Sequence, residues 1–184
     1  MIRHHLFDSR KVPAHLHYQI LSFVRMEWPE LFSGEKRLQN WTSKPELHPV
    51  TLLIEEEGVL ISRLEVVWDM LHHAGEVYKV YGLSGVLTYP AFRKQGYALQ
   101  LVREAIAYIK QQGDADLVLL HSTLKGFYEK AGLERMENLV TLVGDPKEPA
   151  ISDETAFLLF LSEKGLRGRQ AFETQPVYMG ESIW

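Results

Sequence analysis

The chain has 184 residues, of which 46% are hydrophobic and 24% are charged, so it can bury the core of one domain. Its formal charge of -4 gives no overall attraction to nucleic acid or to an anionic membrane, and we expect neither as a partner. It has no cysteine, which excludes disulfides, thiolate metal sites and a cysteine nucleophile.

The first residues, 1–5, lack the apolar core of a signal peptide. No apolar run approaches the roughly 18 residues that a membrane span needs. We therefore expect a cytoplasmic protein.

The first part of the chain predicts a strand and then a helix. Residues 2–7 suit a short strand, and Pro13 suits the first turn of a helix whose apolar residues recur at the helical period up to Trp28. The helix should end around Pro29. The polar segment 32–45 is predicted to hold a short second helix and loops.

The next part of the chain, from residue 50, has the sequence pattern of β-strands. The apolar stretches 50–54, 59–71 and 77–88 are separated by the turn signals Gly58 and Ala74-Gly75. This pattern predicts an antiparallel meander.

After the meander the hydrophobic period switches from two to 3.6 residues. Apolar residues spaced for one helix face predict an amphipathic helix that ends before Gly113; they are Ala98, Leu101, Val102, Ala105, Ile106 and Ile109.

The last third of the chain is predicted to alternate strands and helices. Residues 116–120 form a buried strand, and 124–131 form a short helix stopped by Gly132. Strands near 137–143 and 155–161 precede a polar helical stretch.

Residues 86–99 read as a strand, a turn through Pro90, two cations and a glycine where the next helix begins. A helix N-terminus offers unpaired N–H groups and the positive end of the peptide dipole, and Gly96 lets the backbone approach a ligand. Such a site suits a pyrophosphate. The loop lacks the G-K-(S/T) of a Walker loop and has one glycine where a Rossmann fingerprint has three.

This loop resembles the acetyl-CoA motif of Gcn5-related N-acetyltransferases (GNAT), (Q/R)-x-x-G-x-(G/A). The resemblance implies acetyl-CoA as co-substrate. Its pantetheine arm would lie along the backbone of Val86, Leu87 and Thr88. Its pyrophosphate would lie on Arg93, Lys94, Gln95, Gly96, Tyr97 and Ala98.

A second segment, residues 127–133, resembles the F-Y-x-x-x-G-F element of the same superfamily. By this resemblance Tyr128 points to the sulfur of acetyl-CoA and protonates the departing thiolate. The alternative is a tyrosine buried only for packing. Family members often carry Asn seven residues and Ala four residues before this tyrosine, where the chain has His121 and Leu124.

The resemblance implies a GNAT fold: a single α/β (α+β) N-acetyltransferase domain over residues 1–184. Its sheet would be mixed, mostly antiparallel and twisted, with helices on both faces. A splayed pair, the strand ending near Thr88 and the strand 116–120, would hold acetyl-CoA. A small-molecule amine would enter near Trp184 and the loops before Val50; a homodimer is left open.

Within the superfamily, the chain is most similar to aminoglycoside 2'-N-acetyltransferases. The similarity lies in the block 65–88, with a turn at Gly75 and the pattern Tyr81-Gly82-x-x-Gly85-Val86, and in a final tryptophan after a polar tail. Serines stand at two of that family's acidic positions, Ser84 and Ser182. Loss of the acids removes Coulomb attraction for a polycationic sugar, so we expect another amine and keep aminoglycosides as the alternative.

A general base is suggested by the predicted hairpin. If its turn is centred on 74–75, Ser84 faces Glu65, with Cβ atoms roughly 4.5–5.5 Å apart. Glu65 is then the candidate base, and Ser84 relays a proton or holds a water. A register error of one residue would put Glu65 on the solvated face. A water chain, Asp69 or His121 would replace it.

Other chemistries find little support. Adjacent residues on a strand point to opposite faces, so His72 and His73 cannot easily share an ion, and no H-E-x-x-H occurs; we expect no metal. There is no G-x-S-x-G elbow of a serine hydrolase. The remaining alternatives are a sensor that binds acetyl-CoA without turnover and an interaction module that does not bind it.

Overall fold

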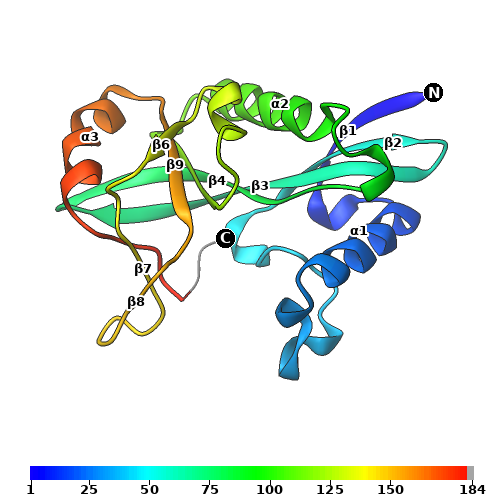
Figure 1. Ribbon diagram of the computed structural model, residues 1–184, viewed down its shortest axis with the longest axis horizontal. Helices are drawn as coiled ribbons and strands as arrows, with labels where there is room; N and C mark the ends of the chain where they lie inside the picture. The colour runs from blue at the N-terminus through cyan, green and yellow to red at the C-terminus, as the bar shows by residue number, and fades with distance from the viewer. Residues whose placement is uncertain (182–184) are drawn as a thin grey trace. The chain divides into compact units, whose positions relative to one another are not determined.

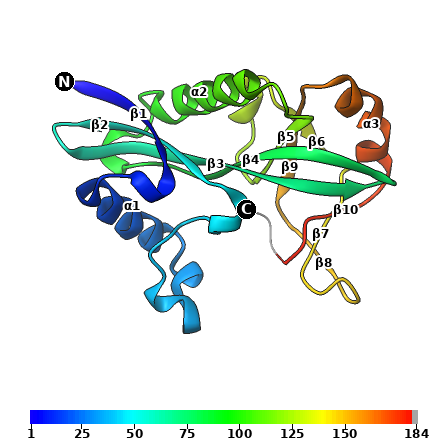
Figure 2. The same ribbon diagram turned by 180° about the vertical axis from the view of Figure 1, so that it is seen from behind.

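The computed structural model describes residues 1–181 (Figures 1 and 2). Among these residues the α-helices are α1 (Ala14–Glu27), α2 (Tyr97–Gln112) and α3 (Glu163–Thr174). The strands are β1 (Ile2–Asp8), β2 (Val50–Glu56), β3 (Val59–His73), β4 (Glu76–Thr88), β5 (Leu117–Ser122), β6 (Glu134–Met136), β7 (Thr141–Val143), β8 (Ala150–Ile151), β9 (Thr155–Phe160) and β10 (Val177–Tyr178). Short 3-10 helices are η1 (Ser9–Lys11), η2 (Pro29–Phe32), η3 (Gly34–Leu38), η4 (Pro45–Leu47), η5 (Pro90–Phe92) and η6 (Tyr128–Ala131).

Seven strands follow one another in the order β1-β2-β3-β4-β5-β9-β6, and a second sheet has the order β10-β7-β8. The pairs β1–β2, β2–β3, β5–β9, β6–β9 and β7–β8 are antiparallel, while β4–β5 and β10–β7 are parallel. The predicted mixed, mostly antiparallel sheet is therefore confirmed.

Contacts within the chain group the residues into two compact units. The first comprises Met1–Val67 and Ser84–Val102, and the second comprises Trp68–Leu83 and the residues from Arg103 onward. Each is described by itself.

The first unit builds its core between α1 and the strands β2, β3 and β4 (Figure 1). The apolar stripe of α1 packs on side chains of the strands, as the helical period predicts. The buried members are Leu16, Ile20, Phe23, Val24, Leu53, Leu60 and Leu87. Burial of each large side chain contributes about 1.5–3 kcal/mol, so this stripe fixes α1 against the strands.

The second helix expected in residues 32–45 does not form an α-helix. The 3-10 helices η3 and η4 occupy parts of this segment, with bonds such as Lys36 N–H to Ser33 O at 3.0 Å. Gly34, with φ 56°, and Pro45 stand at the starts of η3 and η4, and both turns are too short for a cooperative α-helix.

The second unit contains β5, which pairs with β4 on one side and β9 on the other. Its core includes Tyr78, Val80, Leu117, Leu119, Met136, Leu158, Phe172 and Val177. Figure 2 shows β7, β8 and β10 side by side, as their pairing requires. Parallel pairing of β4 with β5 covers Val80–Gly82 and Leu117–Leu119, and β4 runs on to Thr88 beyond the last pair.

Two predicted elements of the second unit differ in the structure. The helix expected over 124–131 is the 3-10 helix η6, which begins only at Tyr128 and ends as predicted at Gly132, with φ 91°. Of the strand expected over 137–143, only the last part forms a strand, β7, whereas β6 ends before the range, at Met136. The segment 123–127 contains Gly126, with φ 71°, which interrupts a helix at that point.

Asp116 ties three segments of the second unit together. Its carboxylate accepts hydrogen bonds from the N–H of Lys79 at 2.9 Å and the hydroxyl of Ser162 at 2.6 Å, and pairs with Lys164 at 2.5 Å. Burial alone would raise the pKa of Asp116, but the bonds from Lys164, Ser162 and Lys79 outweigh it and lower the pKa below its usual value. The carboxylate is therefore ionised at neutral pH.

We expect Asp116→Ala to lower the free energy of unfolding by about 2–3 kcal/mol, because partly buried donors lose a charged acceptor. The pKa is lower in the folded state, so this stabilisation is complete above the usual value of 3.8 and is lost as pH falls through the folded pKa. Urea denaturation of both proteins at neutral pH and at about pH 2 measures the difference. A difference in the free energy of unfolding that stays the same at acid pH would contradict a stabilising role of the ionised Asp116 carboxylate.

Candidate functional site

The loop before α2 has left-handed backbone beside open space. Lys94 and Gly96 both have left-handed backbone, with φ 65° and 91°. Apart from chain neighbours, no described atom lies within 4 Å of the position that a Cβ on Gly96 would take. The N–H of Gln100 donates to Gly96 O at 3.0 Å, so the N–H groups of the first turn of α2 have no helical acceptor. Open space beside Gly96 and the start of a helix together suit a pyrophosphate.

The two cations of the loop differ in their surroundings. Arg93 donates to Thr88 O at 3.0 Å and pairs with Glu27 of α1 at 2.7 Å, so its charge is largely compensated. Lys94 is exposed beside Gly96. Arg93 therefore fixes the loop to the end of β4, and Lys94 carries the charge that a phosphate would meet.

The last residues of β4 are held by β3 and by the loop. Ser62, on β3, donates its hydroxyl to Leu87 O at 2.7 Å and lies 2.8 Å from the Thr88 hydroxyl oxygen. The Leu87 side chain points into the core of the first unit. Of the expected pantetheine strand, Val86 and Thr88 are half-buried, whereas Leu87 can offer a ligand only its backbone.

Tyr128 lies in η6 and is 5% exposed. Its ring packs against Phe127 and Phe157, with centroid distances of 4.8 and 5.3 Å. Burial raises the pKa of Tyr128 to about 12, against the opposing effect of a hydrogen bond from Ser122. The phenol therefore keeps its proton at neutral pH and can act as a proton donor.

His121 stands near the end of β5. Its Nε2 lies 2.8 Å from the Thr141 hydroxyl, and its Nδ1 is buried without a partner among residues 1–181. Burial lowers the pKa of His121 to about 4, so the ring is neutral at pH 7 and is a weak base.

Glu65 and Ser84 lie on one buried hydrogen-bond network. The Ser43 hydroxyl donates to Glu65 Oε2 at 2.6 Å and lies 3.4 Å from Ser84 Oγ. Thr42 donates to the same carboxylate oxygen at 2.8 Å, and Arg63 pairs with Oε1 at 3.0 Å. Glu65 is 3% exposed, so the alternative of a solvated carboxylate is wrong.

The protonation state of Glu65 follows from this network. Burial alone would raise its pKa, but the charge of Arg63 and the hydrogen bonds from Ser43 and Thr42 outweigh it, so the pKa is lowered. The carboxylate is ionised across the neutral range. It is therefore ready to accept a proton, although its affinity for one is low.

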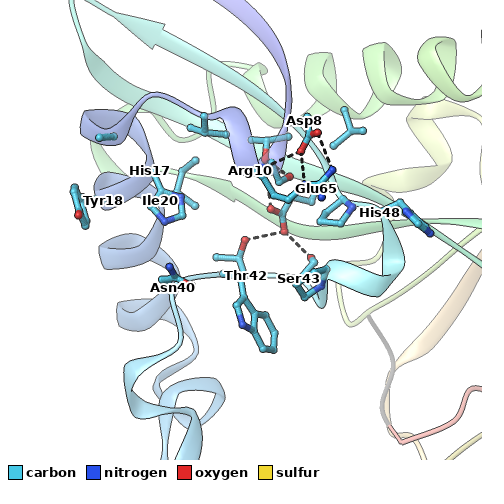
Figure 3. A pocket seen from close by; sticks show the side chains of 18 residues that line it. Asp8, Arg10, His17, Tyr18, Ile20, Asn40, Thr42, Ser43, His48 and Glu65 are labelled. Carbon is cyan, nitrogen blue, oxygen red and sulfur yellow. Dashed lines mark hydrogen bonds and ion pairs between the residues drawn. The ribbon is translucent and has the colours of Figure 1, made fainter.

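A pocket of about 640 Å³ opens in the first unit beside Glu65 (Figure 3). Figure 3 shows His17, Tyr18 and Ile20 of α1 along one side and Asn40, Thr42 and Ser43 along another. The size lies within the range of small-molecule sites. Both carboxylates in its wall have arginine partners: Asp8 pairs with Arg10 at 3.2 Å, and Glu65 pairs with Arg63.

The pocket lies at the loops before Val50, where the sequence predicts that the acceptor enters. The other predicted acceptor contact, Trp184, lies outside the described residues. Arg63, Thr42 and Ser43 were missed by sequence reasoning. One signal was present: Arg63 and Glu65 stand two apart, and so on one face, in a mostly apolar stretch of the strand, which is typical of a buried ion pair.

Among residues 1–181, no group of three or more histidine, aspartate or glutamate side chains is placed to hold a metal ion. No described helix is long and apolar enough to cross a membrane.

Comparisons with known proteins point to one family. The profile of the acetyltransferase (GNAT) domain matches residues 8–136, which is more than half of the chain. A comparison with curated proteins finds no match.

Many solved structures share this fold. A GNAT family acetyltransferase from Brucella melitensis, in complex with acetyl-CoA, has a TM-score of 0.52 and 17% identity, over 87% of this chain and 89% of that one. An acyl-CoA N-acyltransferase from Pseudomonas aeruginosa has a TM-score of 0.56 and 17% identity, over 86% and 99%. A conserved protein of unknown function from Enterococcus faecalis V583 has a TM-score of 0.59 and 17% identity, over 74% of this chain but only 33% of that one. At these identities the likeness establishes the fold.

Proposed function

Because this chain belongs to the GNAT acetyltransferase family, whose members use acetyl-CoA as co-substrate, we propose that it transfers the acetyl group to a primary amine of a small molecule. The observation that carries the proposal is the left-handed turn at Gly96, which leaves open space beside the N–H groups at the start of α2. An anionic pyrophosphate suits those groups and the neighbouring Lys94.

The residues that would hold acetyl-CoA follow from the loop and the end of β4. The backbone of Gly96, Tyr97 and Ala98 and the side chain of Lys94 would bind the pyrophosphate. Gln95 and Arg93 would shape the loop, Arg93 through its bond to Thr88 O. The backbone of Val86, Leu87 and Thr88 would bind the pantetheine arm.

Acetyl-CoA supplies an activated thioester: attack by a neutral amine forms the C–N bond and breaks the C–S bond. The amine loses one proton and the departing sulfur gains one. Tyr128 is the proposed donor to the sulfur, because burial keeps its phenol protonated and desolvation also raises the proton affinity of a thiolate. Glu65 is the proposed acceptor of the amine proton, through Ser43 and Ser84.

We expect Glu65→Gln to lower turnover by about tenfold, below the usual range for a general base, because a carboxylate of low pKa is poorly matched to the task. Acetyl-CoA affinity should be unchanged. If the wild-type rate rises between pH 6 and 9, the rise should come from deprotonation of the acceptor amine. It should therefore persist in the variant. Steady-state rates across pH test this, and a wild-type turnover number in the variant would remove Glu65 from the reaction.

The acceptor is proposed to bind in the pocket of Figure 3. Its wall residue Ser43 lies 3.4 Å from Ser84 on β4, the strand that continues into the proposed pantetheine segment. Because the carboxylates of Asp8 and Glu65 are paired with arginines, the pocket does not strongly favour an ammonium ion. A neutral amine is the form that reacts, so this balance suits catalysis.

Aminoglycosides form the alternative acceptor class. Their several positive charges call for unpaired acids, whereas both carboxylates of the pocket have partners and Ser84 stands at one acidic position of the aminoglycoside 2'-N-acetyltransferases. Ser182, at the other, lies outside the described residues. We therefore expect monoamines to react with a higher kcat/KM than aminoglycosides.

A thermal shift with acetyl-CoA, followed by mass spectrometry of a panel of monoamines, polyamines, aminoglycosides and peptides, tests the proposal. The expected result is stabilisation by acetyl-CoA and acetylation of a small amine. Stabilisation without any acetylated product would favour a sensor, and no stabilisation would favour an interaction module.

A further inference from the structure

A fully buried arginine joins three segments of the first unit. Arg63, on β3, is 1% exposed, and it is the only buried arginine among residues 1–181. Its guanidinium donates to Gly85 O on β4 at 3.1 Å and to the Thr42 hydroxyl at 3.0 Å, and it pairs with Glu65 at 3.0 Å. One side chain thus links β3, β4 and a wall of the pocket.

The contact with Gly85 depends on an unusual backbone. Gly85 has φ 56°, a left-handed conformation inside a strand. A Cβ on Gly85 would collide with Arg63 Nη1, so a side chain at this position would displace the guanidinium from the carbonyl. The conformation of Gly85 and the position of Arg63 therefore depend on each other.

This left-handed residue directly precedes the proposed pantetheine segment, residues 86–88. Rotation about its φ and ψ sets the direction of the N–H and C=O groups that follow. A ligand bound through backbone groups needs those groups preorganised, because ordering them on binding costs affinity. Side chains bond the carbonyls of Leu87 and Thr88 further along, and Arg63 bonds the carbonyl of Gly85, where the left-handed turn sets the direction of the segment.

We propose that Arg63 is a positioning residue for acetyl-CoA: its hydrogen bond to Gly85 O holds the left-handed turn in β4 and so orients the backbone of residues 86–88. The inference rests on the proposed function. The competing interpretation is that Arg63 only neutralises Glu65 in the core. The two interpretations predict different acetyl-CoA affinities once the bond from Arg63 to Gly85 is removed.

The variant must remove the bond to Gly85 without leaving a buried charge unpaired. Arg63→Met alone would strand the carboxylate of Glu65, which is strongly destabilising. In Arg63→Met/Glu65→Gln both positions are neutral, methionine fills much of the arginine volume, and the glutamine oxygen can still accept from Thr42 and Ser43. The Gly85 carbonyl then loses its charged donor, while the bonds that hold Thr42 and Ser43 in the pocket wall remain.

Calorimetric titration with acetyl-CoA compares this double variant with Glu65→Gln and with the wild type. Ile54→Val, a fully buried change on β2, is the control for a small loss of stability. We expect the double variant to bind acetyl-CoA about tenfold more weakly than Glu65→Gln, within the usual range of coupling between sites. Ile54→Val should bind as the wild type does.

Affinities of the double variant and Glu65→Gln that agree within about twofold would show that Arg63 is only structural. If either variant does not fold, Arg63→Lys replaces it: a point charge still faces Glu65 but cannot span Gly85, Thr42 and Glu65 together, and the same loss of affinity relative to the wild type is expected. A wild type that does not bind acetyl-CoA would instead overturn the proposed function.

Discussion

Replacement of Gly96 by glutamate is expected to abolish acetyl-CoA binding while the protein stays folded. The new side chain has room, because no described atom beyond the chain neighbours lies within 4 Å of its Cβ position. Left-handed backbone at φ 91° costs about 1–2 kcal/mol for a residue other than glycine. A carboxylate at the start of α2 offsets part of this cost through the helix dipole.

The loss of binding follows from charge and bulk. The carboxylate would compete with the pyrophosphate for the N–H groups of α2 and repel it. Calorimetry measures binding. Gly75→Glu is the matched control, since Gly75 has φ 82° and equally open space but lies in the β3–β4 turn. Wild-type affinity in Gly96→Glu would refute the assignment of the loop.

Tyr128→Phe is expected to lower turnover by about 10² and to leave acetyl-CoA affinity nearly intact. The figure is the low end of general-acid contributions, and the phenyl ring keeps the packing against Phe127 and Phe157. Tyr178→Phe is the control, because it removes a tyrosine hydroxyl that donates to Gly144 O. Single-turnover rates measure the chemical step.

The pKa of Tyr128 adds a second expectation. Since burial raises it to about 12, the wild-type rate should show no falling limb from this residue up to about pH 10. A turnover number unchanged in Tyr128→Phe, with chemistry rate-limiting, would leave this tyrosine with a packing role alone.

Elements with a local cause could be predicted from the sequence. The β3–β4 turn forms where Ala74 and Gly75 both accept positive φ, at 51° and 82°, and such a two-residue turn matches the twist of the strands. Helix α2 follows from its 3.6-residue period and ends before Gly113, as predicted. The left-handed backbone before α2 also depends on residues next to one another in sequence, whereas the binding of acetyl-CoA by this loop stays a prediction.

The buried network could not be predicted, because it depends on residues distant in sequence. Thr42 and Ser43 reach Glu65 across 23 and 22 positions, from a segment whose 3-10 turns the apolar pattern does not specify. The alternation along the strands predicts that Glu65 and Ser84 share a face. It does not predict that Arg63 lies beside Glu65 and lowers the pKa of that carboxyl. Burial, and not sequence spacing, makes His121 a neutral, weak base.

The central claim, acetyl transfer from acetyl-CoA to an amine, is tested most directly by release of thiol. The chain contains no cysteine, so a thiol reagent reacts only with the coenzyme A that is released. We expect thiol release that requires the protein, acetyl-CoA and a primary amine together, at a rate that saturates with the amine. Tight binding of acetyl-CoA with no thiol released above the uncatalysed rate, for any amine of the panel, would contradict it.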